Sequence, residues 1–382
     1  MHTLRPFQTQ ALQALKQNSH VICVAPTGSG KSLIYETEAA LPGRRTLLVS
    51  PLVALGRQQA SRLRNKGVSV NLKMGSDSTK PDPNKDDPKS AVWICSPEFL
   101  FSDNRKGALF NRWKPNFLVV DECHCLWEWG DQFRPLFKKL PSLLDSAVFD
   151  FKIQKSLWLT ASLPPAARSA LRSSLPDPIH EIGEFGLPKA LHFRTMRVPW
   201  LNRPQALIHS ILSKKAPGIV FASTKSAVER IARLLATINR RVVIYHSGLS
   251  KEERIATELA ISQNSIDVVV ATSAFGMGMD YPALSWVTLW QAPLSLLSLT
   301  QAIGRVGRGN QAGEALVMWD NADFELMNWA ARNSERASED LVKLYEFLNS
   351  PSCRCQSLSA YFGTNRSACF ADLSCDFCSQ FI

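Results

Sequence analysis

The sequence predicts an α/β protein with two parallel-sheet lobes and a small helical module at the C-terminal end. Apolar runs that have the length of buried strands alternate with helical segments between residues 21 and 175, and this alternation resumes at residue 218. Such alternation is typical of parallel sheets, because each crossover between parallel strands is a helix. We expect lobes at residues 1–185 and 186–325, a module at 326–382, and a connection within the proline-rich stretch near 185–203.

Length and composition indicate a globular protein with ordinary cores. The 382 residues are 45% hydrophobic and 20% charged, which excludes bulk disorder and leaves room for two or three domains. The 44 Lys and Arg against 33 Asp and Glu give a net charge of +11, which favours a polyanionic partner such as nucleic acid. Many soluble proteins are basic for no specific reason, so charge alone leaves the question open.

The chain carries no signal for membrane insertion or secretion. No apolar run approaches the ~18 residues of a membrane helix, and the first ten residues lack the apolar centre of a signal peptide. The nine cysteines are an odd number, and several of them lie in strand-like stretches. This usage predicts reduced thiols in an intracellular compartment, cytoplasmic or nuclear.

The first strand is followed by a glycine-rich turn that predicts a nucleotide site. The turn APTGSGKS, residues 25–32, lies between the apolar run 21–24 and a helix expected at 33–40. Such a turn directs backbone N–H groups at a β-phosphate, while Lys31 reaches the β- and γ-phosphates and Ser32 ligates Mg²⁺. We therefore expect ATP and Mg²⁺ here, unless this is a chance glycine-rich turn. The expected contacts are Thr27, Gly28, Ser29, Gly30, Lys31 and Ser32.

A pair of carboxylates ends the buried strand 117–120. In a parallel sheet the ends of strands share one edge, so Asp121 and Glu122 are expected to face the glycine-rich turn. Asp121 would hold Mg²⁺ and Glu122 would polarise the attacking water. An ordinary polar turn is disfavoured because a phosphate loop lies about 90 residues upstream. Hydroxyls at the end of the strand 156–162 are expected to hydrogen-bond this motif.

Aromatic and basic residues directly follow the carboxylates. Aromatic rings stack on unpaired bases, and arginine adds phosphate or cation–π contacts, although at least one of the two tryptophans is expected in the core. The expected DNA contacts are Trp127, Trp129, Phe133 and Arg134, together with Arg57 on the exposed face of a helix at 52–63.

Two arginines in the second lobe are candidates for γ-phosphate contacts. The segment 301–309 is predicted to open a helix that carries Arg305 and Arg308 on one face. The pair suits arginine fingers that reach across a cleft, whereas a lone R-x-x-R is more often a solvated face. Flanking glycines, which permit close approach, favour the fingers.

Cysteines near the C-terminal end have the spacing of a metal site. Cys353, Cys369, Cys375 and Cys378 form a C-x15-C-x5-C-x2-C pattern, which predicts tetrahedral Zn²⁺ in an intracellular chain. The C-x2-C pair is the specific part of the pattern. Cys355 is a spare that could replace Cys353, and free or disulfide-bonded thiols are the alternative.

Together these motifs resemble the RecQ branch of the superfamily 2 helicases. The resemblance covers almost the whole chain and includes an aromatic-rich loop after DECH, which separates RecQ from most superfamily 2 relatives. The matching segments are LRPFQ (4–8), APTGSGKS (25–32), VSPLVAL (49–55), DECH (121–124) with CLWEWGDQFRP (125–135), LTAS (159–162), YHSGL (245–249), ATSAFGMGMDYP (271–282) and QAIGRVGRG (301–309).

The resemblance implies two RecA-like lobes, a C-terminal zinc-binding module, and ATP-driven 3′→5′ unwinding of DNA in repair or recombination. It implies that Gln8, in the same motif as Arg5, senses adenine, whereas the residues alone favour helix capping. It also implies that the loop carrying Trp129 couples DNA binding to hydrolysis. Arg308 becomes the preferred finger, and Cys353 becomes the first zinc ligand, which leaves Cys355 as the odd cysteine.

Departures from the family pattern limit these expectations. Cys123 stands where Ala is common, Gly309 where Asp is frequent, and Cys369-x5-Cys375 is longer than usual. The sequence ends at Ile382, before the winged-helix and HRDC-type domains of many RecQ proteins. Expected partners are single-stranded DNA, tailed or forked duplex DNA, and a protein that could supply the missing functions. Alternatives are a DNA-stimulated translocase that does not unwind alone, a binding or scaffold protein, and an RNA substrate.

Overall fold

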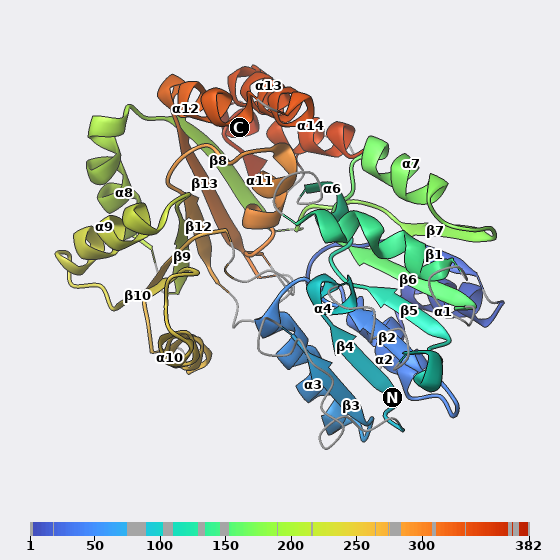
Figure 1. The fold of residues 1–382 in the computed structure, drawn as a ribbon. Helices are drawn as coiled ribbons and strands as arrows, with labels where there is room; N and C mark the ends of the chain where they lie inside the picture. Colours follow the sequence, from blue (N-terminus) through green and yellow to red (C-terminus); the bar gives the residue numbers. More distant parts are fainter. Residues whose placement is uncertain are drawn as a thin grey trace. The chain divides into compact units, whose positions relative to one another are not determined.

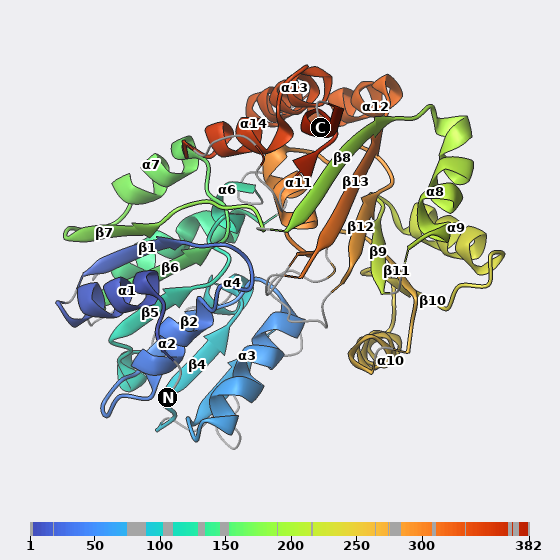
Figure 2. The ribbon, with the colours of Figure 1, turned by 180° about the vertical axis from the view of Figure 1, so that it is seen from behind.

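The computed structural model divides the chain into two compact units, Met1–Phe185 and Gly186–Ile382 (Figures 1 and 2). Side chains of Lys251 and Ala330 are outside the description. The described residues are 3–17, 19–74, 89–101, 110–128, 134–145, 153–188, 190–214, 217–263, 265–273, 275, 284–307, 311–332, 334–365, 369 and 374–380.

The first unit is organised around a seven-stranded sheet in which every paired neighbour is parallel. Its central strands are apolar at successive positions, because both faces of the sheet are covered. In spatial order the strands are β3 (Val70–Lys73), β4 (Val92–Cys95), β2 (Thr46–Val49), β5 (Phe117–Val120), β6 (Lys155–Thr160), β1 (His20–Val24) and β7 (Ile179–Gly183).

Two separate cores cover the two faces of this sheet. One face packs against α1 (Pro6–Lys16), α2 (Ser32–Ala39) and α3 (Val53–Asn65). The other packs against α4 (Pro97–Phe101), the 3-10 helix η2 (Pro135–Leu144) and α7 (Pro165–Ser173), while the short α6 (Cys125–Glu128) follows β5. Alternate residues of each strand contribute to opposite cores, as the two-residue side-chain period requires.

The second unit repeats the plan with a second seven-stranded parallel sheet. The strand order is β10 (Val242–Tyr245), β11 (Val268–Ala271), β9 (Gly218–Phe221), β12 (Trp286–Leu289), β13 (Gly313–Trp319), β8 (Leu191–Arg197) and β14 (Ser374–Cys375). The other elements are η3 (Trp200–Asn202), α8 (Arg203–Leu212), α9 (Lys225–Ala236), α10 (Lys251–Ser262), α11 (Leu296–Ile303), α12 (Asn321–Ala331), α13 (Glu335–Asn349), α14 (Arg354–Tyr361) and η5 (Cys378–Gln380).

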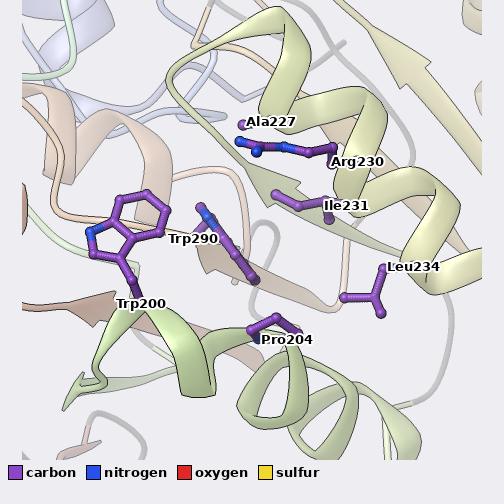
Figure 3. Close-up of a pocket in the computed structure, with 7 residues that line it drawn as sticks. All are labelled: Trp200, Pro204, Ala227, Arg230, Ile231, Leu234 and Trp290. Atoms are coloured by element: carbon purple, nitrogen blue, oxygen red, sulfur yellow. The ribbon is translucent and has the colours of Figure 1, made fainter.

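Helices α8 and α9 pack on one face of the second sheet and leave a cavity of about 320 Å³ beside Trp290 (Figure 3). The indole of Trp200 meets that of Trp290 edge-on, with ring centroids 6.3 Å apart. The guanidinium of Arg203 lies 4.1 Å from the centroid of Trp200, so one face of this ring is already covered. The cavity is lined by Trp200, Pro204, Ala227, Arg230, Ile231, Leu234 and Trp290.

The C-terminal elements build onto the second sheet. Strand β14 pairs in parallel with β8, and the ring of Phe193 in β8 stacks on Phe347 of α13, with centroids 6.2 Å apart. The predicted class, two parallel-sheet lobes with C-terminal helices and a cysteine cluster, is confirmed. The cysteine-bearing segment is more than an appended module, however, because it supplies an edge strand to the sheet.

The structure corrects the sequence interpretation around residues 176–203. This stretch was expected to be mainly connection, but it contains β7 of the first sheet and β8 of the second. Prolines flank these strands without interrupting them, which explains why their density suggested a linker. The strand at 287–290 was also expected to be the last clear one, but β13 follows it as an interior strand. Strand β3 was not predicted either.

Candidate nucleotide site and cysteine centre

The glycine-rich turn joins β1 to α2, as the sequence predicts. Gly28 and Gly30 adopt φ angles of +74° and +84°, a backbone region that residues with a Cβ rarely occupy. Thr27 is half-buried, and Gly28 and Gly30 are exposed, whereas Ser29 is buried. The loop therefore presents its glycine backbone outward in front of the first turn of α2, the arrangement that binds phosphate in other proteins.

Lys31 and Gln8 are both tied to this loop. The Lys31 ammonium donates to the carbonyl oxygens of Ala25 at 2.6 Å and Pro26 at 3.1 Å. The Gln8 amide donates to the carbonyl oxygen of Gly30 at 2.8 Å, while its Oε1 accepts from the Arg5 backbone N–H at 2.8 Å. Gln8 thus links the start of α1 to the loop, and its proposed contact with adenine has no counterpart among these bonds.

The carboxylate motif lies at the same edge of the sheet. It follows β5, the turn follows β1, and β6 lies between these two parallel strands. The Asp121 carboxylate is buried and accepts hydrogen bonds from the Gln59 side chain at 2.7 Å and the Glu122 backbone N–H at 3.0 Å. Burial, and after it the charge of Glu122, raises the pKa of Asp121 to about 7, and the positive charge of Lys31 opposes this shift.

The electrostatics of Asp121 fit a divalent cation. Lys31 acts on its carboxyl group, and the charge of Asp121 in turn adds to burial in raising the pKa of Tyr35 in α2. Asp121 therefore faces the loop and the first turns of α2, where Ser32 also lies. Carboxylate and hydroxyl oxygens are suitable ligands for Mg²⁺, and a bound cation would relieve the cost of the buried negative charge.

Glu122 has a strained backbone, with φ of +51°. This value is rare for a residue with a Cβ and is compatible with a functional site, where neighbouring contacts hold the conformation. Here the next residue, Cys123, donates its backbone N–H to the carbonyl oxygen of Leu159 at 2.8 Å. His124 lies 3.0 Å from the Thr160 hydroxyl and 3.4 Å from the Glu122 carboxylate. The expected hydroxyl contact between the LTAS segment and the carboxylate motif is therefore confirmed.

Sequence reasoning missed Gln59, which was interpreted as an exposed residue of α3. Gln59 is 2% exposed and its side chain bonds the catalytic-type carboxylate of Asp121. Helical periodicity carries the signal, because Leu55, Gln59 and Leu63 recur every four residues and lie on the buried side. A glutamine within an apolar stripe needs a polar partner, and Asp121 is that partner.

The aromatic segment is described only in part. Trp127 packs against the core of the first unit, which agrees with the expectation that one tryptophan is structural. Arg134 makes a two-pronged ion pair with Glu98, at 2.7 and 2.6 Å, and donates to the Pro51 carbonyl at 2.5 Å. Although burial opposes it, Arg134 holds the pKa of Glu98 below its usual value. Trp129 and Phe133 lie outside the described residues, and Arg57 is exposed on α3.

The structure corrects the position of the arginine motif in the second unit. Residues 301–309 were expected to open a helix, but α11 ends at Ile303, with Gly304 as its C-cap. Glycine readily ends a helix, and Gly307, with φ of +71°, continues the turn. Arg305 is therefore buried in the turn after the helix rather than exposed on a helical face. Arg308 lies outside the described residues.

The C-terminal cysteines converge, as the spacing predicts, but the closest set differs from the expected one. The thiols of Cys353, Cys355, Cys369 and Cys375 all lie within 4.8 Å of one another. Cys355 was expected to be the odd cysteine, yet α14 places it in this cluster because it lies one residue beyond the Arg354 that starts the helix. The Cys378 thiol also interacts with those of Cys353, Cys369 and Cys375.

The cluster fits a tetrahedral Zn²⁺ site. A hydrogen bond from Cys355, together with backbone N–H groups, lowers the pKa of Cys375 to about 3 despite burial. A thiolate is the form that binds zinc. Arg354 fixes the surrounding backbone by bonding the carbonyl oxygens of Phe347 at 2.7 Å and Ser350 at 2.8 Å. All nine cysteines are described, and none of them forms a disulfide.

Comparisons with known proteins place the chain in a family. The model for the DEAD/DEAH box helicase family matches residues 5–170, and that for the helicase conserved C-terminal domain matches residues 202–310. The "ATP-dependent DNA helicase RecQ" of Pasteurella multocida is 28% identical over 98% of this chain and 60% of its own length. Rat "ATP-dependent DNA helicase Q5" is 27% identical over 98% of this chain and 42% of its own length. The chain thus spans about 60% or less of these two relatives.

Solved structures show the same fold at lower identity. Yeast Dbp5 bound to RNA and ADP BeF3 has a TM-score of 0.66 and 16% identity, covering 91% of this chain and 92% of that one. Mycobacterium smegmatis Lhr bound to ssDNA and AMP-PNP has a TM-score of 0.65 and 20% identity, covering 91% of this chain and 51% of its own. Within the described part of the chain, no helix has the length and apolarity to cross a membrane. With both helicase models matched in order and similarity to RecQ proteins along 98% of its length, the chain belongs to the superfamily 2 helicases.

Proposed function

We propose that this protein is an ATP-dependent motor of RecQ type that translocates 3′→5′ on single-stranded DNA and unwinds duplex DNA. The observation that carries the proposal is the shared sheet edge, where the phosphate loop after β1 and the carboxylates after β5 flank β6. The similarity to RecQ proteins supports DNA as the substrate and a role in repair or recombination.

The residues of the first unit divide the work of ATP hydrolysis. The loop backbone from Thr27 to Gly30 would bind the phosphates, and Lys31 would leave its carbonyl partners to contact the β- and γ-phosphates. Mg²⁺, held by Ser32 and Asp121, would neutralise the phosphate charge. Glu122 would orient the attacking water and accept its proton, with His124 beside its carboxylate.

The remaining site residues have roles in nucleotide choice and coupling. Gln8 would exchange its bonds to the loop and to Arg5 for contacts with adenine. Arg305 and Arg308 would stabilise the negative charge that builds on the γ-phosphate, as arginine fingers do. Trp129, Phe133 and Arg134 would report DNA binding to the carboxylates, with Trp127 and Arg57 supporting the DNA contact. Zn²⁺ at the cysteine cluster would stabilise the C-terminal elements.

The first test compares Lys31→Ala with the exposed-lysine control Lys16→Ala. We expect Lys31→Ala to lower DNA-stimulated ATP turnover at least about 100-fold, because the lost charge stabilises the transferring phosphoryl group. Binding of a labelled single-stranded oligonucleotide should change less than about threefold. Hydrolysis near the level of Lys16→Ala would overturn the assignment of the nucleotide site.

The second test is strand displacement on 3′-tailed, 5′-tailed and blunt duplexes. Unwinding that requires a 3′ tail would support the RecQ-type polarity and show that the chain unwinds alone. Strong DNA-stimulated ATP hydrolysis without unwinding would favour the second candidate, a translocase that acts with a partner. That candidate is kept because the chain spans about 60% of the length of its RecQ relative from Pasteurella multocida.

A further inference from the structure

Five thiols surround a site that a tetrahedral metal fills with four. Cys353, Cys369 and Cys375 form the shared part: the Cys353 and Cys369 sulfurs are 3.5 Å apart, and those of Cys353 and Cys375 are 4.0 Å apart. Zn–S bonds of about 2.3 Å in a tetrahedron place the sulfurs about 3.8 Å apart. The observed separations bracket this value, so the three shared thiols are already spaced as zinc ligands.

Two further thiols approach these three from different elements. Cys355, in the first turn of α14, belongs to the set whose sulfurs all lie within 4.8 Å and hydrogen-bonds with Cys369 and Cys375. Cys378, at the start of η5, interacts with Cys353, Cys369 and Cys375. Each of the two could complete a tetrahedral set with the same three sulfurs. Four positions cannot hold five sulfurs, so one of the two must remain outside.

We propose that Cys355 and Cys378 are interchangeable fourth ligands of one zinc site. This inference rests on the proposed zinc site and goes beyond it, because it assigns a redundant ligand to a particular pair of residues. In the exchange, one Zn–S bond forms as the other breaks. The entering thiol gives up its proton and the leaving thiolate takes one up, so the charge of the site is unchanged and no oxidant is needed.

The framework around the site is suited to such an exchange. Cys353 is the residue before α14, and Cys375 lies in β14, which pairs with β8, so both are held by secondary structure. Arg354 and Asp376 form an ion pair at 3.3 Å, and Thr195 of β8 donates to Asp376 at 2.9 Å. The two candidate fourth ligands differ in burial: Cys355 is buried and Cys378 is half-buried. Cys378 is therefore the thiol that solvent reagents reach more readily.

The test measures zinc in the full chain after purification with one equivalent of metal. Variants Cys355→Ser and Cys378→Ser should each keep about one zinc per chain, with release to a chelator at least about fivefold faster than in the unmodified protein. The double variant should lose the metal, as should the control Cys353→Ser, which removes a shared ligand. Cobalt substitution gives a second readout, since both single variants should retain thiolate-to-cobalt charge-transfer absorption.

Each alternative result overturns the proposal in a recognisable way. If Cys378→Ser alone loses zinc as fully as Cys353→Ser, Cys355 cannot replace it. If Cys355→Ser alone loses zinc, Cys378 is not a substitute, and if the double variant keeps zinc, neither residue is the fourth ligand. An unmodified protein that binds no zinc would remove the zinc site itself and the exchange with it. The nucleotide site would be unaffected, since its test on Lys31 is separate.

Discussion

The carboxyl group of Asp121 is buried, and its stability and its proposed chemistry depend on that burial. Its oxygens accept hydrogen bonds from Gln59 and from the Glu122 backbone, yet Glu122 adds a second negative charge beside it. A protein that needs a cation at this position gains from a carboxylate that is poorly stabilised without one. The cost of the ionised group should therefore be visible in stability measurements made without metal.

We expect stability in EDTA to fall as pH rises from about 4 to about 7. The folded pKa of Asp121 is raised to about 7, so the folded state binds more protons than the unfolded state within this window. Asp121→Asn removes the effect, and above pH 7 its free energy of unfolding should exceed that of the unmodified protein by about 1–3 kcal/mol. The difference should vanish near pH 4. Denaturant titrations at several pH values measure it, and parallel pH profiles would contradict the prediction.

Gly218 shows how one missing side chain allows a large one to pack. An ideal Cβ at this position would lie 1.8 Å from an indole carbon of Trp286, which is buried across the neighbouring strand. The site is on β9 at the centre of the second sheet, where the backbone has little freedom to shift. Packing therefore requires glycine here.

Gly218→Ala should destabilise the second unit by at least about 3 kcal/mol, because overpacking in a rigid core typically costs 1–3 kcal/mol and this overlap is severe. Gly43→Ala is the control: its Cβ meets nothing within 4 Å, and only its φ of +72° opposes the change, at a cost of about 1 kcal/mol. Chemical denaturation followed by tryptophan fluorescence compares the two. Equal losses in the two variants would show that Trp286 can move aside.

At the scale of elements, α8 and α12 are joined by a buried ion pair. Arg203 and Asp323 are both fully buried, and the guanidinium donates two bonds to the carboxylate, at 3.0 and 2.9 Å. Asp323 also accepts from the backbone N–H groups of Ala292 and Asp320, each at 3.1 Å. These contacts connect two helices, the start of α12 and the segment after β12, so one carboxylate positions several elements.

Asp323→Ala should cost about 3–5 kcal/mol, because it leaves the Arg203 charge buried without its partner. Lys343→Ala is the matched control, since it breaks an exposed i,i+4 pair with Glu339 and should cost no more than about 0.5 kcal/mol. Denaturant titration of the full chain measures both free energies. A loss below about 1 kcal/mol for Asp323→Ala would show that water or another acid compensates the arginine.

At the scale of the whole molecule, the net charge of +11 and the superfamily 2 fold favour a grip on the phosphate backbone of nucleic acid. Contacts to phosphate carry little sequence information, which suits a motor that must move along any strand. The exposed Arg57 on α3 is one proposed contribution to this grip. Its removal should weaken binding to all sequences alike.

Affinity for single-stranded DNA should fall steeply with salt. Each phosphate neutralised on a single strand contributes about −0.7 to the slope of log K against log salt concentration, so five contacts predict a slope near −3.5. Raising salt from about 50 to about 200 mM should then weaken binding roughly 100-fold. Fluorescence anisotropy with a labelled oligonucleotide measures the slope, and a slope near zero would contradict a phosphate grip.

The sequence by itself determined the class of fold and the position of the phosphate loop and carboxylates. These features depend on local chemistry: apolar runs form buried strands, and Gly28 and Gly30 permit a turn that other residues resist. The parallel order then brings the ends of β1 and β5 to one edge, as expected from a strand–helix alternation.

Only the tertiary structure decided which side chains meet. It buries Gln59 against Asp121, places Cys355 in the thiol cluster, and ends α11 before Arg305 rather than starting a helix there. It also assigns β8 to the interior of a sheet from a stretch that resembles a linker. These outcomes depend on partners distant in sequence, so burial and pairing, which no local pattern contains, determine them.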